Sequence, residues 1–206
     1  MLATAASWPA STVAARAKST HVQCPPPHRR LIDADAQAVI YLGLFETPEE
    51  EVYACAYGSP RRYRLGPPAS GSEVGSRGVG PIALSGLIVA YGRGYSLATS
   101  GQSDHEIWVR NLVTGKVLYR TPNGSPSGPG SIGLGETVAI VVKRDRAVAW
   151  TVRAGIQLGG FQVRSVDKTG GHILAMSTEI EPDSLALAGS TVYWTQGSKT
   201  YSAQLQ

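Results

Sequence analysis

The chain has little charge, few aromatic residues and only two cysteines, and each shortage excludes a class of protein. Of its 206 residues, 17% are charged and 7% are aromatic. A coiled coil or a charge-rich disordered chain needs far more Glu, Lys and Arg, so both are excluded. No apolar run is long enough for a membrane-spanning helix, so we expect no membrane span. The 24 glycines and 13 prolines, which lack the collagen period, predict a turn-rich globular domain of the all-β class.

The net charge of +4 is located in the N-terminal segment. Residues 1–30 contain no acidic residue and four basic ones, Arg16, Lys18, Arg29 and Arg30. Removing these four from the 19 Lys and Arg leaves as many basic residues as the 15 Asp and Glu that follow. We therefore expect a basic flexible leader over residues 1–30 and a neutral domain over residues 31–206. Because phosphate binding requires clustered cations, we expect this domain not to bind nucleic acid.

The leader has no apolar core of the kind found in a signal peptide. Three interpretations of it remain open: a mature N-terminus left after processing, a truncated gene start, or a disordered tail.

The two cysteines, Cys24 and Cys55, predict a disulfide. They are 31 residues apart, and neither belongs to a Cys-x-x-Cys pair. A zinc site needs about four ligands at recognisable spacings, so we expect no metal and no other cofactor. A bridge would join the leader to the first β segment and would indicate an oxidising compartment, either extracellular or periplasmic. The alternative is a pair of unpaired thiols, one of them buried.

From Leu31 onward, short runs of alternating apolar residues are separated by Gly, Pro, Ser or Asp at intervals of 8–12 residues, which is typical of strands and turns. No window has a helical period with caps, so we expect no long helix. The predicted strands are Ala38–Leu44, Val52–Tyr57, Arg61–Leu65, Ile82–Leu84, Leu87–Tyr91, Tyr95–Thr99, Ile107–Asn111, Lys116–Tyr119, Val138–Val142, Ala147–Arg153, Phe161–Val166, His172–Met176, Ser184–Ala188, Thr191–Gln196 and Thr200–Leu205.

Degenerate internal repeats suggest how these strands are grouped. The segment Val52–Cys55, followed by Gly-Ser, recurs as Val192–Thr195, again followed by Gly-Ser. Trp150 and Trp194 end similar apolar strands 44 residues apart, and we expect them to occupy equivalent packing positions. Division of residues 31–206 into four units gives about 44 residues a unit, which is the size of a four-stranded propeller blade. The sequence therefore predicts a small or partial β-propeller of about four blades, with a β-sandwich as the alternative.

Two stretches resemble known propeller families. Trp108–Leu118 resembles the strand, Thr-Gly-Lys turn and strand of WD-repeat and related bacterial β-propellers. The strand Val192–Trp194 with Gly197-Ser198 is similar to blade strands of secreted bacterial propeller-like repeat proteins. The Trp-Asp and Gly-His signatures of true WD repeats are missing. The resemblance implies a scaffold that binds partners on its faces, and it carries over no catalytic residue.

The last unit, Ser184–Gln206, supplies only three strands. We expect residues 31–35, or the tail before them, to add the fourth strand and close the ring. An incomplete ring could instead be completed by a homodimer.

No motif in the chain indicates a catalytic site. Residues 128–133 match the pattern G-x-G-x-x-G but lack the strand before it and the helix after it that dinucleotide binding requires, so we interpret them as a loop. A nucleophile elbow and an H-E-x-x-H motif are missing. We therefore predict a non-enzymatic module outside the cytoplasm that binds a protein or a carbohydrate. The alternative is a hydrolase or lyase with its site in the central channel of the propeller.

The candidate binding residues lie near residue 108. Trp108 aligns with Gln162, and two interpretations of this position are open: it packs between blades, as Trp150 and Trp194 do, or it faces outward. The second makes Trp108 the better candidate for an exposed contact. The polar stretch before it, Ser103–Glu106, is interpreted as a loop on the binding face, with Asp104, His105 and Glu106 as contacts.

Overall fold

The computed structural model of the chain is all-β and describes residues 24–27, 29–44, 49–72, 75–97, 102–122, 135–154 and 159–206. Four antiparallel sheets follow one another along the chain, and within each sheet the strands pair in sequence order. The first sheet contains β1 (Arg30–Ala34), β2 (Ala38–Gly43), β3 (Glu51–Ala56) and β4 (Tyr63–Gly66). The second contains β5 (Ser70–Ser72), β6 (Gly75–Ser85), β7 (Ile88–Leu97), β8 (Gln102–Asn111) and β9 (Val117–Pro122). The third contains β10 (Thr137–Val142), β11 (Val148–Arg153), β12 (Phe161–Asp167) and β13 (Gly170–Ser177). The fourth contains β14 (Ala186–Ala188), β15 (Thr191–Gln196) and β16 (Lys199–Gln204), and a short 3-10 helix, Pro182–Ser184, precedes it.

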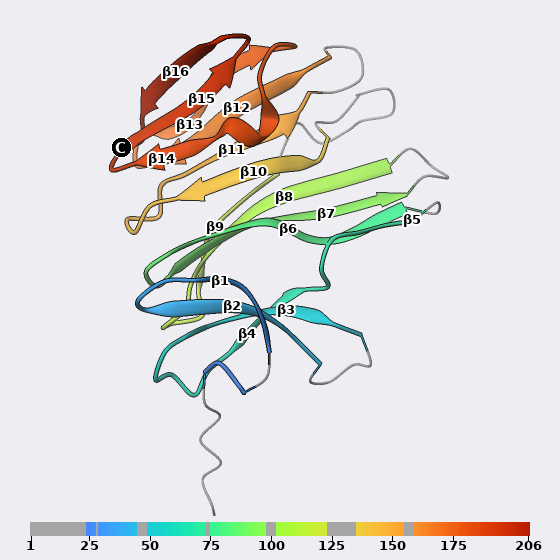
Figure 1. The fold of residues 1–206 in the computed structure, drawn as a ribbon, viewed down its shortest axis with the longest axis vertical. Coiled ribbons are helices and arrows are strands. Elements are labelled where there is room, and N and C mark those ends of the chain that lie inside the picture. Colours follow the sequence, from blue (N-terminus) through green and yellow to red (C-terminus); the bar gives the residue numbers. More distant parts are fainter. Residues whose placement is uncertain are drawn as a thin grey trace, which may run out of the picture.

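The four sheets are stacked face to face in chain order (Figure 1). A separate apolar core fills each of the three spaces between neighbouring sheets. Strand alternation explains how one strand serves two cores: in β7, Val89 and Tyr91 pack toward the first sheet, whereas Ile88 and Ala90 pack toward the third. The two middle sheets are thus covered on both faces, which explains the continuous apolar runs Ile88–Tyr91 in β7 and Val138–Val142 in β10.

Trp150 and Trp194 occupy equivalent positions, as the repeats predict. Trp150 in β11 is buried in the core shared with the second sheet, and Trp194 in β15 in the core shared with the third. Each indole therefore faces the preceding sheet. The stack contains four sheets, which does not match the two sheets of a β-sandwich, the alternative expectation.

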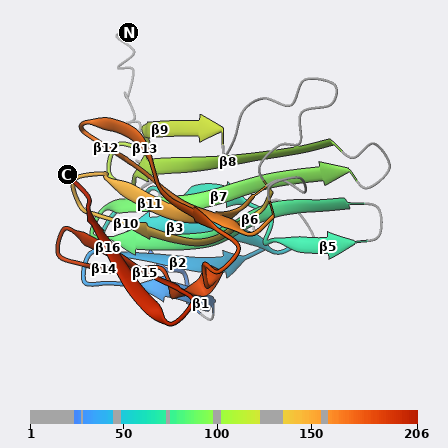
Figure 2. The same ribbon diagram turned by 90° about the horizontal axis from the view of Figure 1, so that it is seen from above.

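Each predicted strand overlaps an observed strand, but the second sheet has longer strands than the sequence indicates. Leu87–Tyr91 and Tyr95–Thr99, expected as two strands, fall largely in the single strand β7. The interpretation of Ser103–Glu106 as a loop is wrong, because these residues belong to β8 and pair with β7 from Gln102 onward. Backbone hydrogen bonding between the two strands continues through polar positions. Seen from above, β6, β7 and β8 extend past the neighbouring sheets (Figure 2).

The fourth sheet has three strands, as predicted, but residues 31–35 do not complete it. Residues 30–34 form β1, which pairs with β2 in the first sheet. The β1–β2 turn is closed locally, because the Asp35 carboxylate accepts hydrogen bonds from the backbone N–H groups of Gln37 and Ala38. Pairing β1 with β2 closes only a short turn, whereas pairing it with the fourth sheet would close a loop across the whole stack. The shorter loop costs less conformational entropy, so β1 pairs with β2. Within the described ranges, no strand joins the first sheet to the fourth. Most of the tail before β1 lies outside the described residues.

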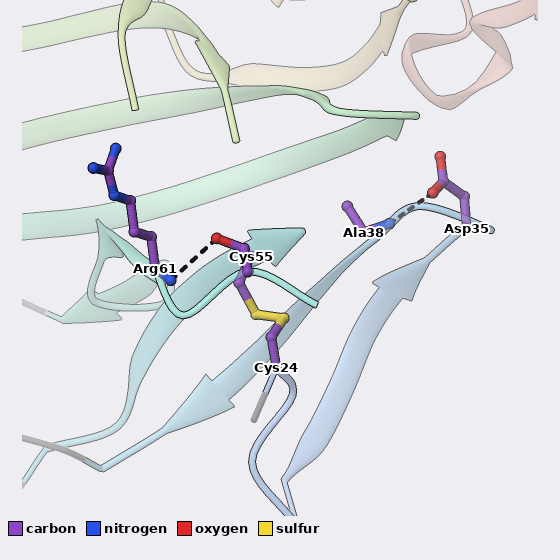
Figure 3. The surroundings of a disulfide bond; sticks show 6 residues. Cys24, Asp35, Ala38, Cys55 and Arg61 are labelled. Atoms are coloured by element: carbon purple, nitrogen blue, oxygen red, sulfur yellow. Dashed lines mark hydrogen bonds between the residues drawn. A yellow bond between two sulfur atoms is a disulfide. The ribbon is translucent and has the colours of Figure 1, made fainter. Parts of the chain in front are cut away.

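The predicted disulfide between Cys24 and Cys55 is confirmed (Figure 3). It attaches residues 24–27 to the outer face of the first sheet, where Val39, Tyr41 and Tyr53 form a fourth apolar cluster around Cys55. Residues before the predicted boundary at Leu31 therefore take part in the first sheet. The bond is consistent with an extracellular or otherwise oxidising location. No helix in the described ranges is long and apolar enough to cross a membrane.

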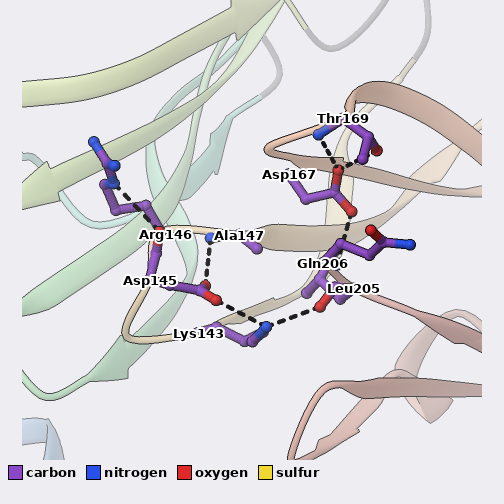
Figure 4. A network of polar contacts seen from close by, with 8 residues as sticks. All are labelled: Lys143, Asp145, Arg146, Ala147, Asp167, Thr169, Leu205 and Gln206. Atoms are coloured by element: carbon purple, nitrogen blue, oxygen red, sulfur yellow. Dashed lines mark hydrogen bonds and ion pairs between the residues drawn. The ribbon is translucent and has the colours of Figure 1, made fainter.

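Polar contacts at one end of the strands connect neighbouring sheets. The Asp35 carboxylate in the first sheet accepts a hydrogen bond from Gly86 N–H in the second. Lys143 in the third sheet donates to the Leu205 carbonyl, and the Asp167 carboxylate accepts from Gln206 N–H at 2.9 Å (Figure 4). These contacts fix the short turns at this end relative to one another.

Candidate functional site

The candidate site lies on the second sheet, on the face that packs toward the first sheet. Glu106 and Trp108 are two residues apart in β8, so their side chains share this face. The strand register places Trp108 opposite Arg120 of β9 and Glu106 opposite Arg93 of β7. We call the set Arg93, Glu106, Trp108 and Arg120 the Trp108 patch.

The indole of Trp108 organises the patch. Its ring centroid lies 5.4 Å from the guanidinium carbon of Arg93 and 5.0 Å from that of Arg120, both within cation–π range. The ring also stacks with Tyr91, with centroids 6.1 Å apart and an interplanar angle of 28°. Two cations from strands on opposite sides of β8 are thus held against one aromatic ring.

Glu106 connects the indole to one of the arginines. One carboxylate oxygen accepts a hydrogen bond from Trp108 Nε1 at 2.8 Å, and the other accepts one from Arg120 Nε at 2.8 Å. The Glu106 side chain is 16% exposed, whereas that of Arg120 is 57% exposed. The carboxylate is therefore enclosed, while more than half of the Arg120 side chain surface is exposed.

The electrostatics of the patch keep Glu106 ionised. Burial alone would raise the pKa of Glu106, but hydrogen bonds from Arg120 and Trp108 and the positive charges of Arg120 and Arg93 lower it below its ordinary value. At neutral pH the patch then carries two positive charges and one negative charge, and Glu106 offsets only one of its arginines.

The structure brings together two of the four predicted binding residues, Trp108 and Glu106. His105 lies on the opposite face of β8, where its imidazole packs against Gly94 of β7. Asp104 belongs to β8, but its side chain lies outside the described residues. These positions are on a strand, so the interpretation of a binding loop is corrected to a binding sheet face.

Of the two interpretations of the Trp108 position, the structure favours packing over a side chain that faces outward. Trp108 and Gln162 do occupy corresponding strands, each next to the last strand of its sheet. However, Gln162 is only 5% exposed, and Trp108 is half-buried because it packs against the core between the first two sheets. The Trp108 side chain therefore contacts both the core and the two arginines.

Sequence reasoning missed Arg93 and Arg120. Both are separated from Trp108 along the chain and meet it only through strand pairing. The turn after β8 indicates a hairpin, but a register shift between Val109 and Arg110 moves the pairing by one residue. Simple counting from the turn would therefore place Arg120 opposite the wrong residue.

Comparisons with protein-family models, with curated proteins and with solved structures found no match to this chain.

Proposed function

We propose that this chain is a non-enzymatic binding module that works outside the cytoplasm and binds a protein partner through the Trp108 patch. The observation that carries the proposal is the arrangement of Arg93 and Arg120 around one half-buried indole. Trp and Arg are the residues that most often supply binding energy at protein interfaces. Here both arginines are already oriented by the ring, so less side-chain entropy is lost when a partner binds.

The contacts of Trp108 favour a protein over a carbohydrate. A sugar ring packs on an aromatic face, but Tyr91, Arg93 and Arg120 already contact this indole. A guanidinium that stacks on a ring still presents N–H groups at its edge, and these pair well with carboxylates. We therefore infer that the partner presents Asp or Glu side chains to the patch.

The stacked sheets act as the scaffold of this module. Four consecutive antiparallel sheets packed face to face support a propeller-like arrangement in which each sheet corresponds to one blade. The arginines of the patch are exposed at the border of the core between the first two sheets, where a partner can reach them. The disulfide supports the assignment to an oxidising, extracytoplasmic location.

The proposal is tested by affinity capture from the extracellular fraction of the source organism, together with a glycan array. The variant R93E reverses one charge of the patch, while Trp108 still packs against the core. A matched control, Tyr193→Ala, removes an exposed aromatic residue from the fourth sheet. We expect wild type and Tyr193→Ala to retain the same protein and R93E to retain at least tenfold less, because a charge-assisted pair is lost.

Equal capture by wild type and R93E would show that the patch is not the binding surface. Binding to glycans that R93E abolishes would instead assign the patch to carbohydrate recognition. Thermal melts of each variant identify any loss of binding that results from unfolding.

A further inference from the structure

A groove of about 400 Å³ lies between the second and third sheets, away from the Trp108 patch. Its walls are the start of β9, the β10–β11 turn, and the end of β12 with the turn that follows it. The lining residues are Leu118, Tyr119, Asp145, Arg146, Ala147, Val166, Asp167, Lys168 and Gln206. This volume falls in the range of small-molecule sites.

The two acidic residues of the groove are engaged within the chain (Figure 4). The Asp145 carboxylate contacts Lys143 Nζ at 2.9 Å and accepts from Ala147 N–H at 3.2 Å. The Asp167 carboxylate accepts from the backbone N–H and the hydroxyl of Thr169, at 2.8 and 2.6 Å. Each carboxylate therefore fixes the turn that carries it.

The two basic residues of the groove, Arg146 and Lys168, are exposed. Among the described residues, neither Arg146 nor Lys168 forms an ion pair. Arg146 Nε donates to the backbone carbonyl of Asp145 at 3.2 Å, and Figure 4 shows its guanidinium directed away from the Asp145 carboxylate. The groove thus offers two cationic groups beside an apolar wall of Leu118, Tyr119 and Val166.

The backbone at Arg146 is strained. Arg146 has a φ of 85°, a left-handed conformation that non-glycine residues rarely adopt, and it alone does so among the described non-glycine residues. The corresponding turns of the second and fourth sheets place Gly86 and Gly189 at their positive φ. Glycine would relieve the strain at residue 146 as well, yet the chain keeps an arginine there. Strained residues of this kind concentrate at functional sites.

We propose that this groove binds a small organic anion whose carboxylate or phosphate group pairs with Arg146 and Lys168. The apolar body of the ligand, preferably an aromatic ring, packs against Tyr119, Leu118 and Val166. The sequence alone does not indicate that the two cations lie close together. Lys168 follows β12, whereas Arg146 belongs to the basic cluster of residues 143–146, which contains its own acid, Asp145. The site is independent of the protein interface proposed above.

The test is an NMR titration of the full chain with phenyl phosphate at low salt, with benzyl alcohol as the neutral comparison. We expect phenyl phosphate to shift the amide signals of Arg146, Asp167 and Lys168, and benzyl alcohol to bind at least tenfold more weakly. The variant Arg146→Gly separates binding from stability. It should raise the melting temperature, because glycine adopts a positive φ without strain, yet reduce phenyl phosphate affinity about tenfold or more.

The matched control is Arg144→Gln, which removes a neighbouring cation. The Arg144 side chain lies close to Gly86 and does not line the groove. We expect this variant to retain wild-type affinity. The proposal is overturned if phenyl phosphate leaves the groove amides unshifted, if benzyl alcohol binds equally well, or if Arg144→Gln weakens binding as much as Arg146→Gly.

Discussion

The first and the fourth sheet each have one face that no other sheet covers, and these two outer faces differ in composition and exposure. The outer face of the first sheet is apolar and covered: Val39, Tyr41, Tyr53 and Cys55 are at most 5% exposed. By alternation, the outer face of the fourth sheet carries small or polar residues around Tyr193, which is 36% exposed. The two inner sheets have no such outer face, because a neighbouring sheet covers each of their faces.

The two outer faces differ in how much apolar surface they would present to water. An apolar outer face would attract another sheet and promote aggregation unless it is covered. A small or polar face can meet water directly, as in the capping units of repeat proteins. A disulfide-linked segment covers the first sheet, whereas no segment among the described residues covers the outer face of the fourth.

The largest effect should come from removing a tyrosine at the covered end. Tyr41 is fully buried and stacks on Tyr53 at 5.9 Å, so Tyr41→Ala should lower the free energy of unfolding by about 3–5 kcal/mol. Tyr193→Ala at the bare end should change it by less than about 0.5 kcal/mol. Urea denaturation of the two variants measures the difference. Similar losses in both variants would mean that the two ends are not energetically distinct.

A slightly smaller effect should follow the loss of the disulfide. The bridge closes a loop of 31 residues, and Cys24→Ala with Cys55→Ala should reduce the free energy of unfolding by about 3–4 kcal/mol on the loop-entropy model. Hydrogen exchange should show greater loss of protection in β2 and β3 than in β15 and β16. Adding a reductant should destabilise the wild type but not the double variant, which therefore serves as the control for that treatment. Uniform loss of protection over all four sheets would contradict a local covering role.

The smallest effect concerns the contact that connects the fourth sheet to the third. The Asp167 side chain is 3% exposed and accepts hydrogen bonds from Thr169 and Gln206, so Asp167→Asn should destabilise the fold by about 1.5–3 kcal/mol. Thermal melts at neutral pH measure this loss. A variant as stable as wild type would show that the contact adds nothing to the bare end.

The same contact predicts a dependence on pH. Burial alone would raise the pKa of Asp167, but hydrogen bonds from Thr169 and Gln206 lower it below its ordinary value of 3.8. A depressed pKa in the folded state gives stability that is present above about pH 4 and is lost as the pH falls through the folded value. Wild type should therefore lose more stability than Asp167→Asn between pH 4 and pH 2. Parallel curves for the two proteins would remove Asp167 as the cause.

Much of the fold could be predicted from the sequence because its signals are local. Alternation within a run such as Val192–Gln196 depends on neighbouring residues, and turns are marked by Gly, Pro and Asp. The pairing of β1 was predicted wrongly because periodicity identifies a strand and says nothing about its partner. The local Asp35 turn decided that choice.

The candidate site could be predicted only in part. Trp108 and Glu106 lie two residues apart in the same strand, so the local sequence is enough to place both side chains on one face. Arg93 and Arg120 reach them through the register of two further strands, one of which carries a bulge.

The amino-acid sequence by itself determined the all-β class, most strand positions, the three-stranded last sheet and the disulfide pair, because each depends on periodicity or on a count of cysteines. Only the tertiary structure decided that Trp108 is held between two arginines and that the turns bearing Arg146 and Lys168 form one groove. Both arrangements depend on strand register and on the stacking of sheets. These are long-range properties, since they arise from the packing of residues that are far apart in the chain.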